Sequence, residues 1–442
     1  MRRWLPPIGR DAWLALGLNT LSCLGSGLTM PFLLVYLHTI RGIPLPTAGL
    51  ILATIGVTGL VVVPLTGPLV DRVGSLRAFV GGLALGGVGI ALFAPATTVA
   101  AAFGAAVVYG CSGGLTWNSF ATLLSELAPP RERGPIFALR YTGANAAFGA
   151  GALVAGLITV GETAGPYVAI LLVDALSYLV FAAAMLLVRL PSLPPPAPRT
   201  GGGYRVVLRD RRLLGALLVN TLLTVFALAQ TSTVFAAWVT GPGGSSSRVA
   251  GVAFALNITV LLLVQLPVLR WVRGRSRLRV AALSAVFFAA AWVTLAAGVG
   301  SPALIVLSLG VFALGEALLS PTLPALVNDL APDELRGRYN AVFALSQQAG
   351  PVLAPVLGGL ALGHGLGVPY VLTLAALCLV AGAVALRGVP LTGFPTGGGG
   401  GAGDGRASGR GAGRGRARRG GTHAVADPAE DLGDRGDVPA AQ

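Results

Sequence analysis

Two acidic side chains, Asp174 and Glu316, lie well inside long apolar stretches of the sequence, Glu316 about fourteen residues into its stretch and Asp174 about eight. A carboxylate is costly in hydrocarbon, and without a base at the same depth it favours its protonated form. A group that gains and loses a proton with access to both faces of a membrane is the minimal element of proton coupling. We interpret Glu316, at mid-membrane, as the first candidate for such coupling and Asp174, in the outer half of its stretch, as the second. A neutral, hydrogen-bonded packing role is the alternative for Glu316.

A short charged turn, Gly67-Pro-Leu69-Val-Asp71-Arg72-Val-Gly74, separates the second and third apolar stretches. Charges between two helix-length apolar runs must lie at the membrane boundary, where an Asp–Arg pair can act as a latch. The two glycines permit close backbone approach and a turn with positive φ. The turn is therefore a candidate gate, and the alternative is that its charges only set the topology.

The sequence contains no arrangement of residues that is typical of an enzyme. The three histidines are isolated, and no paired carboxylates, nucleophile–base pair, phosphate loop or metal-ligand cluster is present. We therefore expect no catalysis, no metal and no other cofactor. Because there is no nucleotide-binding loop, transport driven by the chain's own ATP hydrolysis is excluded.

Apolar stretches are the elements that must position these charges. The chain is 54% hydrophobic and only 11% charged, and a hydrocarbon core of about 30 Å needs about 20 apolar residues per helix. Such stretches predict an all-α membrane protein with twelve transmembrane helices, near residues 12–40, 46–70, 78–97, 99–127, 136–160, 166–189, 212–240, 248–270, 279–298, 302–327, 339–362 and 367–387.

The basic residues predict the orientation. There is no lysine, and 29 of the 31 arginines fall on one side or at its edge, with only Arg41 and Arg248 on the other. Because cytoplasmic loops carry the positive charge, we expect both termini in the cytoplasm and a multi-pass protein of the cell membrane.

The net charge of +14 does not indicate a nucleic-acid partner. The tail, 389–442, carries seven arginines against six acidic residues, so nearly all of the excess lies in the inner loops. Anionic membrane lipids are the natural partner there. The tail itself is Gly/Arg-rich and then acidic, a composition that predicts a disordered cytoplasmic segment.

The chain also repeats itself. Ala128-Pro-Pro-Arg-Glu-Arg133-Gly134 returns as Ala331-Pro-Asp-Glu-Leu-Arg336-Gly337, 203 residues later. The repeat predicts two pseudo-symmetric six-helix halves, 1–190 and 205–388, joined by a cytoplasmic linker over 191–204.

With these features the chain resembles the major facilitator superfamily, whose signature G-x-L-x-D-R/K-x-G-R/K-R/K it matches through Gly74; Ser75 and Leu76 stand where two bases are expected. The resemblance covers nearly the whole chain except linker and tail. It implies two halves around a central site near mid-bilayer. It also implies a gate on the cytoplasmic face formed by Gly67, Asp71, Arg72, Gly74, Glu126 and Arg133.

A second family signature, found on the fifth helix of proton-coupled drug exporters, ends in G-P-x-x-G-G. The fifth stretch here offers Gly149 and Gly151 without a proline, and the proline-bearing version, Gly350-Pro351, lies on the eleventh. We interpret these four residues as helix-packing positions, because small residues let helices approach closely whatever the function.

Polar residues in the stretches expected to line the central cavity are candidates for a substrate pocket, with hydrogen bonding between helices as the alternative. The set contains no buried arginine or lysine, which argues against an anionic substrate and favours an amphipathic or apolar one, a cation included. The candidates are Asn19, Asn118, Asn145, Asn220, Gln230, Asn257 and Gln347.

Together these features predict a monomeric secondary active transporter that exports a small amphipathic or apolar molecule in exchange for protons. Two alternatives stay open. One is an importer or facilitator of a small solute on the same fold, and the other is a receptor or scaffold that keeps the fold without transport.

Overall fold

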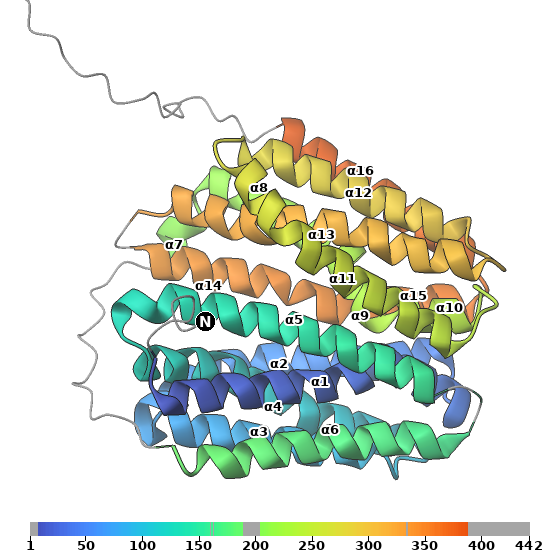
Figure 1. Ribbon diagram of the computed structural model, residues 1–442, viewed down its shortest axis with the longest axis horizontal. Coiled ribbons are helices and arrows are strands. Elements are labelled where there is room, and N and C mark those ends of the chain that lie inside the picture. The colour runs from blue at the N-terminus through green and yellow to red at the C-terminus, as the bar shows by residue number, and fades with distance from the viewer. Residues whose placement is uncertain (1–7, 160, 162, 189–203, 333–334, 388–442) are drawn as a thin grey trace, which may run out of the picture. The chain divides into compact units, whose positions relative to one another are not determined.

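The computed structural model describes residues 8–159, 161, 163–188, 204–332 and 335–387. This part of the chain is helical and contains no strand. Twelve of its helical spans are long and apolar enough to cross a membrane, which confirms the predicted fold class (Figure 1). The expected linker, 191–204, lies outside the described residues except for Tyr204, and the expected tail, 389–442, lies wholly outside them.

Six spans precede the linker and six follow it. In chain order the elements are α1 (Arg10–Val35), η1 (Tyr36–Ile40), α2 (Leu45–Val73), α3 (Ser75–Phe93), α4 (Val99–Leu127), η2 (Pro130–Glu132), α5 (Arg133–Ile158), α6 (Ala164–Met185), α7 (Tyr204–Val207), α8 (Arg211–Leu223), η3 (Thr224–Leu228), α9 (Ala229–Thr233), α10 (Phe235–Thr240), α11 (Ser247–Val272), α12 (Arg277–Ala296), α13 (Pro302–Leu330), α14 (Arg336–Gln347), α15 (Ala349–Gly363) and α16 (Gly367–Arg387).

Two spans are broken inside the second half. The seventh passes from α8 into the π-helical η3, and the chain is interrupted again at Val234 between α9 and α10. The eleventh is divided at Gln348. Pro351 explains the break at Gln348 in the eleventh span, because proline has no amide hydrogen to donate to the carbonyl of Gln347 four residues earlier.

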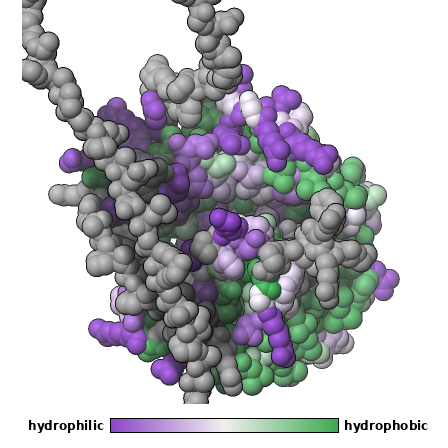
Figure 2. All heavy atoms as spheres, turned by 60° about the vertical axis from the view of Figure 1, so that its left-hand side comes forward, coloured by the Kyte–Doolittle hydropathy of each residue, from purple (hydrophilic) through white to green (hydrophobic). Residues whose placement is uncertain are grey.

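The loops define two ends of the bundle. We call the end formed by the α2–α3, α4–α5, α11–α12 and α13–α14 connections the arginine-rich end, and the other the opposite end. Figure 2 views the arginine-rich end obliquely and shows hydrophilic residues gathered there, while the flank on the right is largely apolar. Gly74 (φ +89°) and Gly274 (φ +76°) turn the chain at corresponding places in the two halves, in a conformation that favours glycine.

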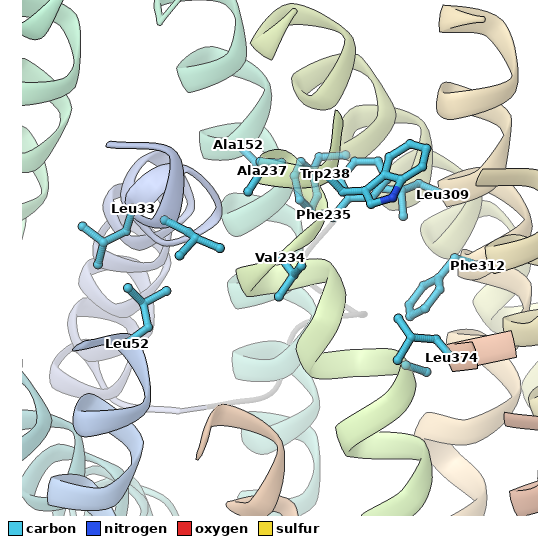
Figure 3. Packing of buried hydrophobic residues seen from close by; sticks show 14 of the residues in the cluster. Leu33, Leu52, Ala152, Val234, Phe235, Ala237, Trp238, Leu309, Phe312 and Leu374 are labelled. Carbon is cyan, nitrogen blue, oxygen red and sulfur yellow. The ribbon is translucent and has the colours of Figure 1, made fainter. Parts of the chain in front are cut away.

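The buried core is shared at one end and divided at the other. A single apolar cluster joins Leu33, Leu52 and Ala152 of the first half to Phe235 and Trp238 of the second, as Figure 3 shows. Toward the arginine-rich end the first half has a separate core, which includes Phe79, Phe120 and Phe181. The halves are therefore packed together at the opposite end and have distinct cores at the arginine-rich end.

Glycines bring backbones together across this shared end. A β-carbon at Gly49 of α2 would overlap the carbonyl of Pro355 in α15, and one at Gly156 of α5 would lie 2.6 Å from Gly251 of α11. The four predicted packing residues also lie at close approaches. Gly149 faces Ile258 of α11, Gly151 faces the Leu24 carbonyl of α1, Gly350 faces Thr224 of η3, and Pro351 faces Gly56 of α2.

Candidate functional site

Glu316 lies at the midpoint of α13, equidistant from Pro302 and Leu330. Its side chain is partly exposed, because it lines two adjoining cavities between the halves, of about 400 Å³ and about 310 Å³. Tyr141 of α5 borders the larger cavity, and Asn145, one turn further along the same helix, borders the smaller. The acid of the second half thus shares a cavity with side chains of the first.

The immediate surroundings of Glu316 are polar. Asn257 of α11 lies near the carboxyl, and its Nδ2 donates to the Leu309 carbonyl at 3.2 Å. Tyr141 approaches Glu316 from the first half, with Ser320 nearby. A carboxyl placed between amide and hydroxyl groups in a hollow that water can reach is able to exchange a proton.

Four predicted pocket residues are brought together around this acid. Asn220 and Gln347 line the larger cavity, and Asn145 and Asn257 line the smaller. Asn220 Nδ2 donates to Ser346 Oγ at 2.8 Å and so ties α8 to α14. Three helices of the second half and one of the first therefore supply amide groups to a common space.

Three other predicted pocket residues line neither cavity. Gln230 is buried, and both ends of its amide are bonded: Nε2 donates to the Val225 carbonyl at 3.0 Å and Oε1 accepts from the Tyr370 hydroxyl at 2.7 Å. Asn19 Nδ2 donates to Cys23 Sγ at 3.8 Å, and Asn118 is half-buried on α4. Gln230 therefore joins α9 to α16 by a hydrogen bond and does not line the substrate pocket.

The sequence predicted Asp174 in the outer half of its span, but the structure places it elsewhere. It is ten residues after Ala164 and eleven before Met185, at the middle of α6, because the helix begins and ends earlier than the apolar stretch indicated. The side chain is fully buried, and neither carboxylate oxygen has a hydrogen-bond partner among the described residues. Neighbouring hydroxyls are engaged elsewhere, since Thr29 donates to the Gly25 carbonyl at 3.2 Å and Ser177 to the Asp174 carbonyl at 2.7 Å.

The predicted gate residues lie at the arginine-rich end but do not form one bonded cluster. Gly67, Asp71, Arg72 and Gly74 are all exposed. Glu126, at the end of α4, accepts a hydrogen bond from the hydroxyl of Ser75, which begins α3, and Arg133 Nε donates to the Ser125 carbonyl at 3.2 Å. No hydrogen bond or ion pair of Asp71 or Arg72 is found among the described residues.

The second half repeats the Ser75–Glu126 contact as an ion pair. Arg277 is the first residue of α12, and its Nε lies 3.5 Å from Oδ2 of Asp329 near the end of α13. Asp329 is the residue that the 203-residue repeat aligns with Glu126. Ser75 thus joins the start of α3 to the end of α4, and Arg277 joins the start of α12 to the end of α13 in the same way.

One functional candidate, Arg140, was missed from the sequence. The fifth span was expected to begin near residue 136, which assigned Arg140 to the membrane boundary, whereas α5 begins at Arg133 and carries Arg140 about 10 Å along its axis. The side chain is half-buried, and its guanidinium carbon lies over the rings of Trp117 and Phe120, 5.5 and 4.7 Å from their centroids. Arg140 thus reaches further along the bundle than the boundary position expected for it, and its side chain is half-buried there.

Comparison with known proteins identifies the same architecture. The family profile of the Major Facilitator Superfamily matches residues 15–245 and 225–413. A Bacillus subtilis (strain 168) protein described as the uncharacterized MFS-type transporter YqjV is 24% identical over 405 residues, which cover 89% of this chain and 95% of that protein.

Solved transporter structures share the fold at low sequence identity. The nucleoside transporter NupG superposes with a TM-score of 0.68 at 14% identity, covering 86% of this chain and 99% of that one. A POT family transporter in complex with 5-aminolevulinic acid has a TM-score of 0.70 at 14% identity, with 87% and 98% covered. The peptide transporter POT in complex with sulfate has a TM-score of 0.68 at 17% identity, with 87% and 96% covered.

Proposed function

The chain belongs to the major facilitator superfamily and is a multi-pass membrane transporter of that type, and from this premise we propose that it exports a small amphipathic or apolar molecule across the cell membrane in exchange for protons. The family and fold point to a carrier rather than an enzyme. The observation that carries the proposal is Glu316, an acid at mid-helix that lines the space between the two halves.

The halves provide the movement that such exchange requires. They share one apolar core at the opposite end and have separate cores at the arginine-rich end. Rocking of one half against the other would open the shared end and bring the exposed turn at Asp71 against the second half. In that exchange the gate residues hold the arginine-rich end closed while cargo leaves on the far side.

Glu316 supplies the coupling. When the cavity faces the arginine-rich end, the carboxyl releases its proton and cargo takes its place beside Asn257 and Tyr141. When the cavity faces the opposite end, a new proton displaces the cargo. Because a charged carboxylate is costly in the closed, partly apolar cavity, the empty transporter turns over with Glu316 protonated, and the loaded one with the carboxylate facing the polar groups of Asn257 and Tyr141.

The cavities limit the cargo to a small molecule. Their combined lining is mostly apolar, with Leu228 common to both, and amides and hydroxyls are interspersed. Such walls suit a molecule with an apolar body and a few polar groups. Protons and a small molecule are therefore the proposed partners of the transport cycle.

Flux in reconstituted vesicles tests the proposal. Purified full-length protein in liposomes is screened against a panel of amphipathic compounds with and without an imposed pH gradient. We expect the gradient to drive accumulation of at least one compound, and the Glu316→Gln variant to lose this drive while keeping binding. Glu132→Gln, the same chemical change outside the cavities, is the matched control. Gradient-driven transport that survives in Glu316→Gln would remove that residue from the mechanism.

The same measurement separates the alternatives. Flux of a solute down its own gradient, insensitive to pH, would identify a facilitator, and accumulation in the reverse direction an importer. No flux with any compound, from protein that is folded in the liposomes, would favour a receptor or scaffold.

A further inference from the structure

Arg140 is a base inside the bundle without an acidic partner. No hydrogen bond or ion pair of its guanidinium is found among the described residues, and the titratable side chain that lies near it is the thiol of Cys23 on α1. The buried acid Asp174 is packed against Gly25 instead. A cation within the span of a membrane helix is costly unless something compensates its charge.

The aromatic rings under Arg140 compensate this charge only in part. Phe120 is fixed in the core of the first half, stacked on Phe79 with ring centroids 4.6 Å apart, whereas Trp117 is 60% exposed. Rings on the face of a guanidinium leave its N–H groups, which point outward in its plane, free to donate. The guanidinium carbon thus lies over two rings, while no hydrogen bond of its N–H groups is found among the described residues.

Arg140 lies where two helices of the first half make few contacts with each other. α4 packs chiefly against α2 and α3, whereas α5 packs chiefly against α1 and α11. The Arg140 side chain bridges from α5 to the α4 rings across the interval between them. Its neighbours on α5, Ala138 and Tyr141, line the larger cavity that contains Glu316.

We infer that Arg140, Trp117 and Phe120 form a subsite for an anionic oxygen group of the cargo, a carboxylate, sulfonate or phosphate, next to an apolar or aromatic body. A guanidinium binds such groups through two parallel hydrogen bonds, and the exposed Trp117 ring offers a surface on which the body packs. The inference rests on the proposed function and narrows its substrate class to amphipathic anions, contrary to the sequence-based expectation of a neutral or cationic molecule.

Equilibrium binding of two matched probes tests the subsite. Full-length protein is placed in nanodiscs of phosphatidylcholine, and the affinities of naphthalenesulfonate and the neutral naphthalenesulfonamide are compared. We expect the sulfonate to bind about tenfold more tightly or better, as one charge-assisted contact allows, and Arg140→Gln to abolish the difference while leaving sulfonamide binding unchanged. Arg77→Gln, which removes an exposed arginine from the same half, should change neither affinity.

A second variant distinguishes loss of the subsite from loss of the folded structure. Arg140→Lys keeps the charge but loses the planar fork, so it should weaken sulfonate binding several-fold without affecting the sulfonamide, even if Arg140→Gln does not fold. Equal affinity for the two probes, a sulfonate preference that survives Arg140→Gln, or a parallel loss of both probes in Arg140→Lys would overturn the assignment.

The anionic group could also come from a lipid. In nanodiscs containing phosphatidylglycerol, a headgroup at Arg140 would compete with the sulfonate in the native protein and co-purify only when Arg140 is present, and this result would overturn the cargo assignment. No gradient is imposed in any arm. Failure of proton-driven flux therefore tells against the proposed function alone, whereas failure of the probe comparison tells against this subsite alone.

Discussion

Asp174 and Gly25 are in such close contact that a β-carbon on Gly25 would lie 2.6 Å from Oδ1 of the buried carboxyl. The contact joins the middle of α6 to α1, and the acid has no hydrogen-bond partner among the described residues. The absence of a side chain at Gly25 therefore leaves the room that the Asp174 carboxyl occupies.

We expect Gly25→Ala to lower the free energy of unfolding by about 1–3 kcal/mol, the usual cost of overpacking. Thermal unfolding of the purified variant measures the loss. Combining it with Asp174→Ala, which removes one of the two clashing oxygens and leaves Ser177 Oγ at 2.7 Å, should recover part of the stability, so that the two substitutions are less than additive. Strict additivity would show that the contact does not limit the packing of α1 on α6.

Gly49→Ala should open the opposite end of the bundle. Its β-carbon would overlap the Pro355 carbonyl, and backbone cannot move aside as a side chain can. A penalty of about 1.4 kcal/mol on the closed arrangement would shift the ratio of the two states about tenfold. The reporter is Leu228→Cys in a background without native cysteines, labelled by a membrane-impermeant maleimide from each side.

In that assay we expect stronger labelling from the opposite end in Gly49→Ala. Gly81→Ala, at a glycine with no atom within 4 Å of the added β-carbon, serves as the control and should leave labelling unchanged. Identical labelling in both variants would mean that the helix contact at Gly49 does not hold this end closed.

The two corresponding contacts at the arginine-rich end should differ in strength. Ser75→Ala deprives the half-buried Glu126 of its donor and should cost about 1 kcal/mol of unfolding free energy. Asp329→Asn should cost less than about 1 kcal/mol and become neutral at high salt, because Arg277 and Asp329 are 33% and 50% exposed. Thermal unfolding at low and high salt distinguishes them, and a salt-sensitive Ser75→Ala effect would contradict the hydrogen-bond interpretation.

Pro351→Ala should make the eleventh span more nearly continuous. The alanine supplies the amide hydrogen that the Gln347 carbonyl lacks, so we expect a higher unfolding temperature and slower transport, since a straight helix has no hinge at this level. Flux measured at saturating cargo tests the rate. An unchanged turnover with raised stability would show that the break is not used in the transport cycle.

The twelve spans were predictable because hydrocarbon imposes a minimum apolar length that almost nothing else in a sequence imitates. Glu316 was predictable for the same reason, since an acid in the middle of such a run stands out. The depth of Asp174 was not, because helix ends at uncharged residues such as Ala164 and Met185 leave little mark in the sequence.

The pocket was predictable only in part. Asn145 and Asn257 reach the cavity, but Gln230 does not, because the π-helical turn of η3 rotates the residues after it relative to a regular helix. Arg140 was missed because a base near the start of a span was assigned to the boundary. Its distance from Arg133, two helical turns, is the signal that could have found it.

Part of the seal at the opposite end is backbone, since glycines such as Gly49 and Gly156 bring helix atoms into direct contact there beside the shared apolar core. Backbone and apolar side chains carry no charge, so a seal of this kind does not recognise a charged group on the molecule that passes. The side chains able to recognise charge, Arg140 and Glu316, lie deeper in the bundle. Under the proposed export, selectivity would therefore be exercised when a molecule is loaded rather than when it is released at the opposite end.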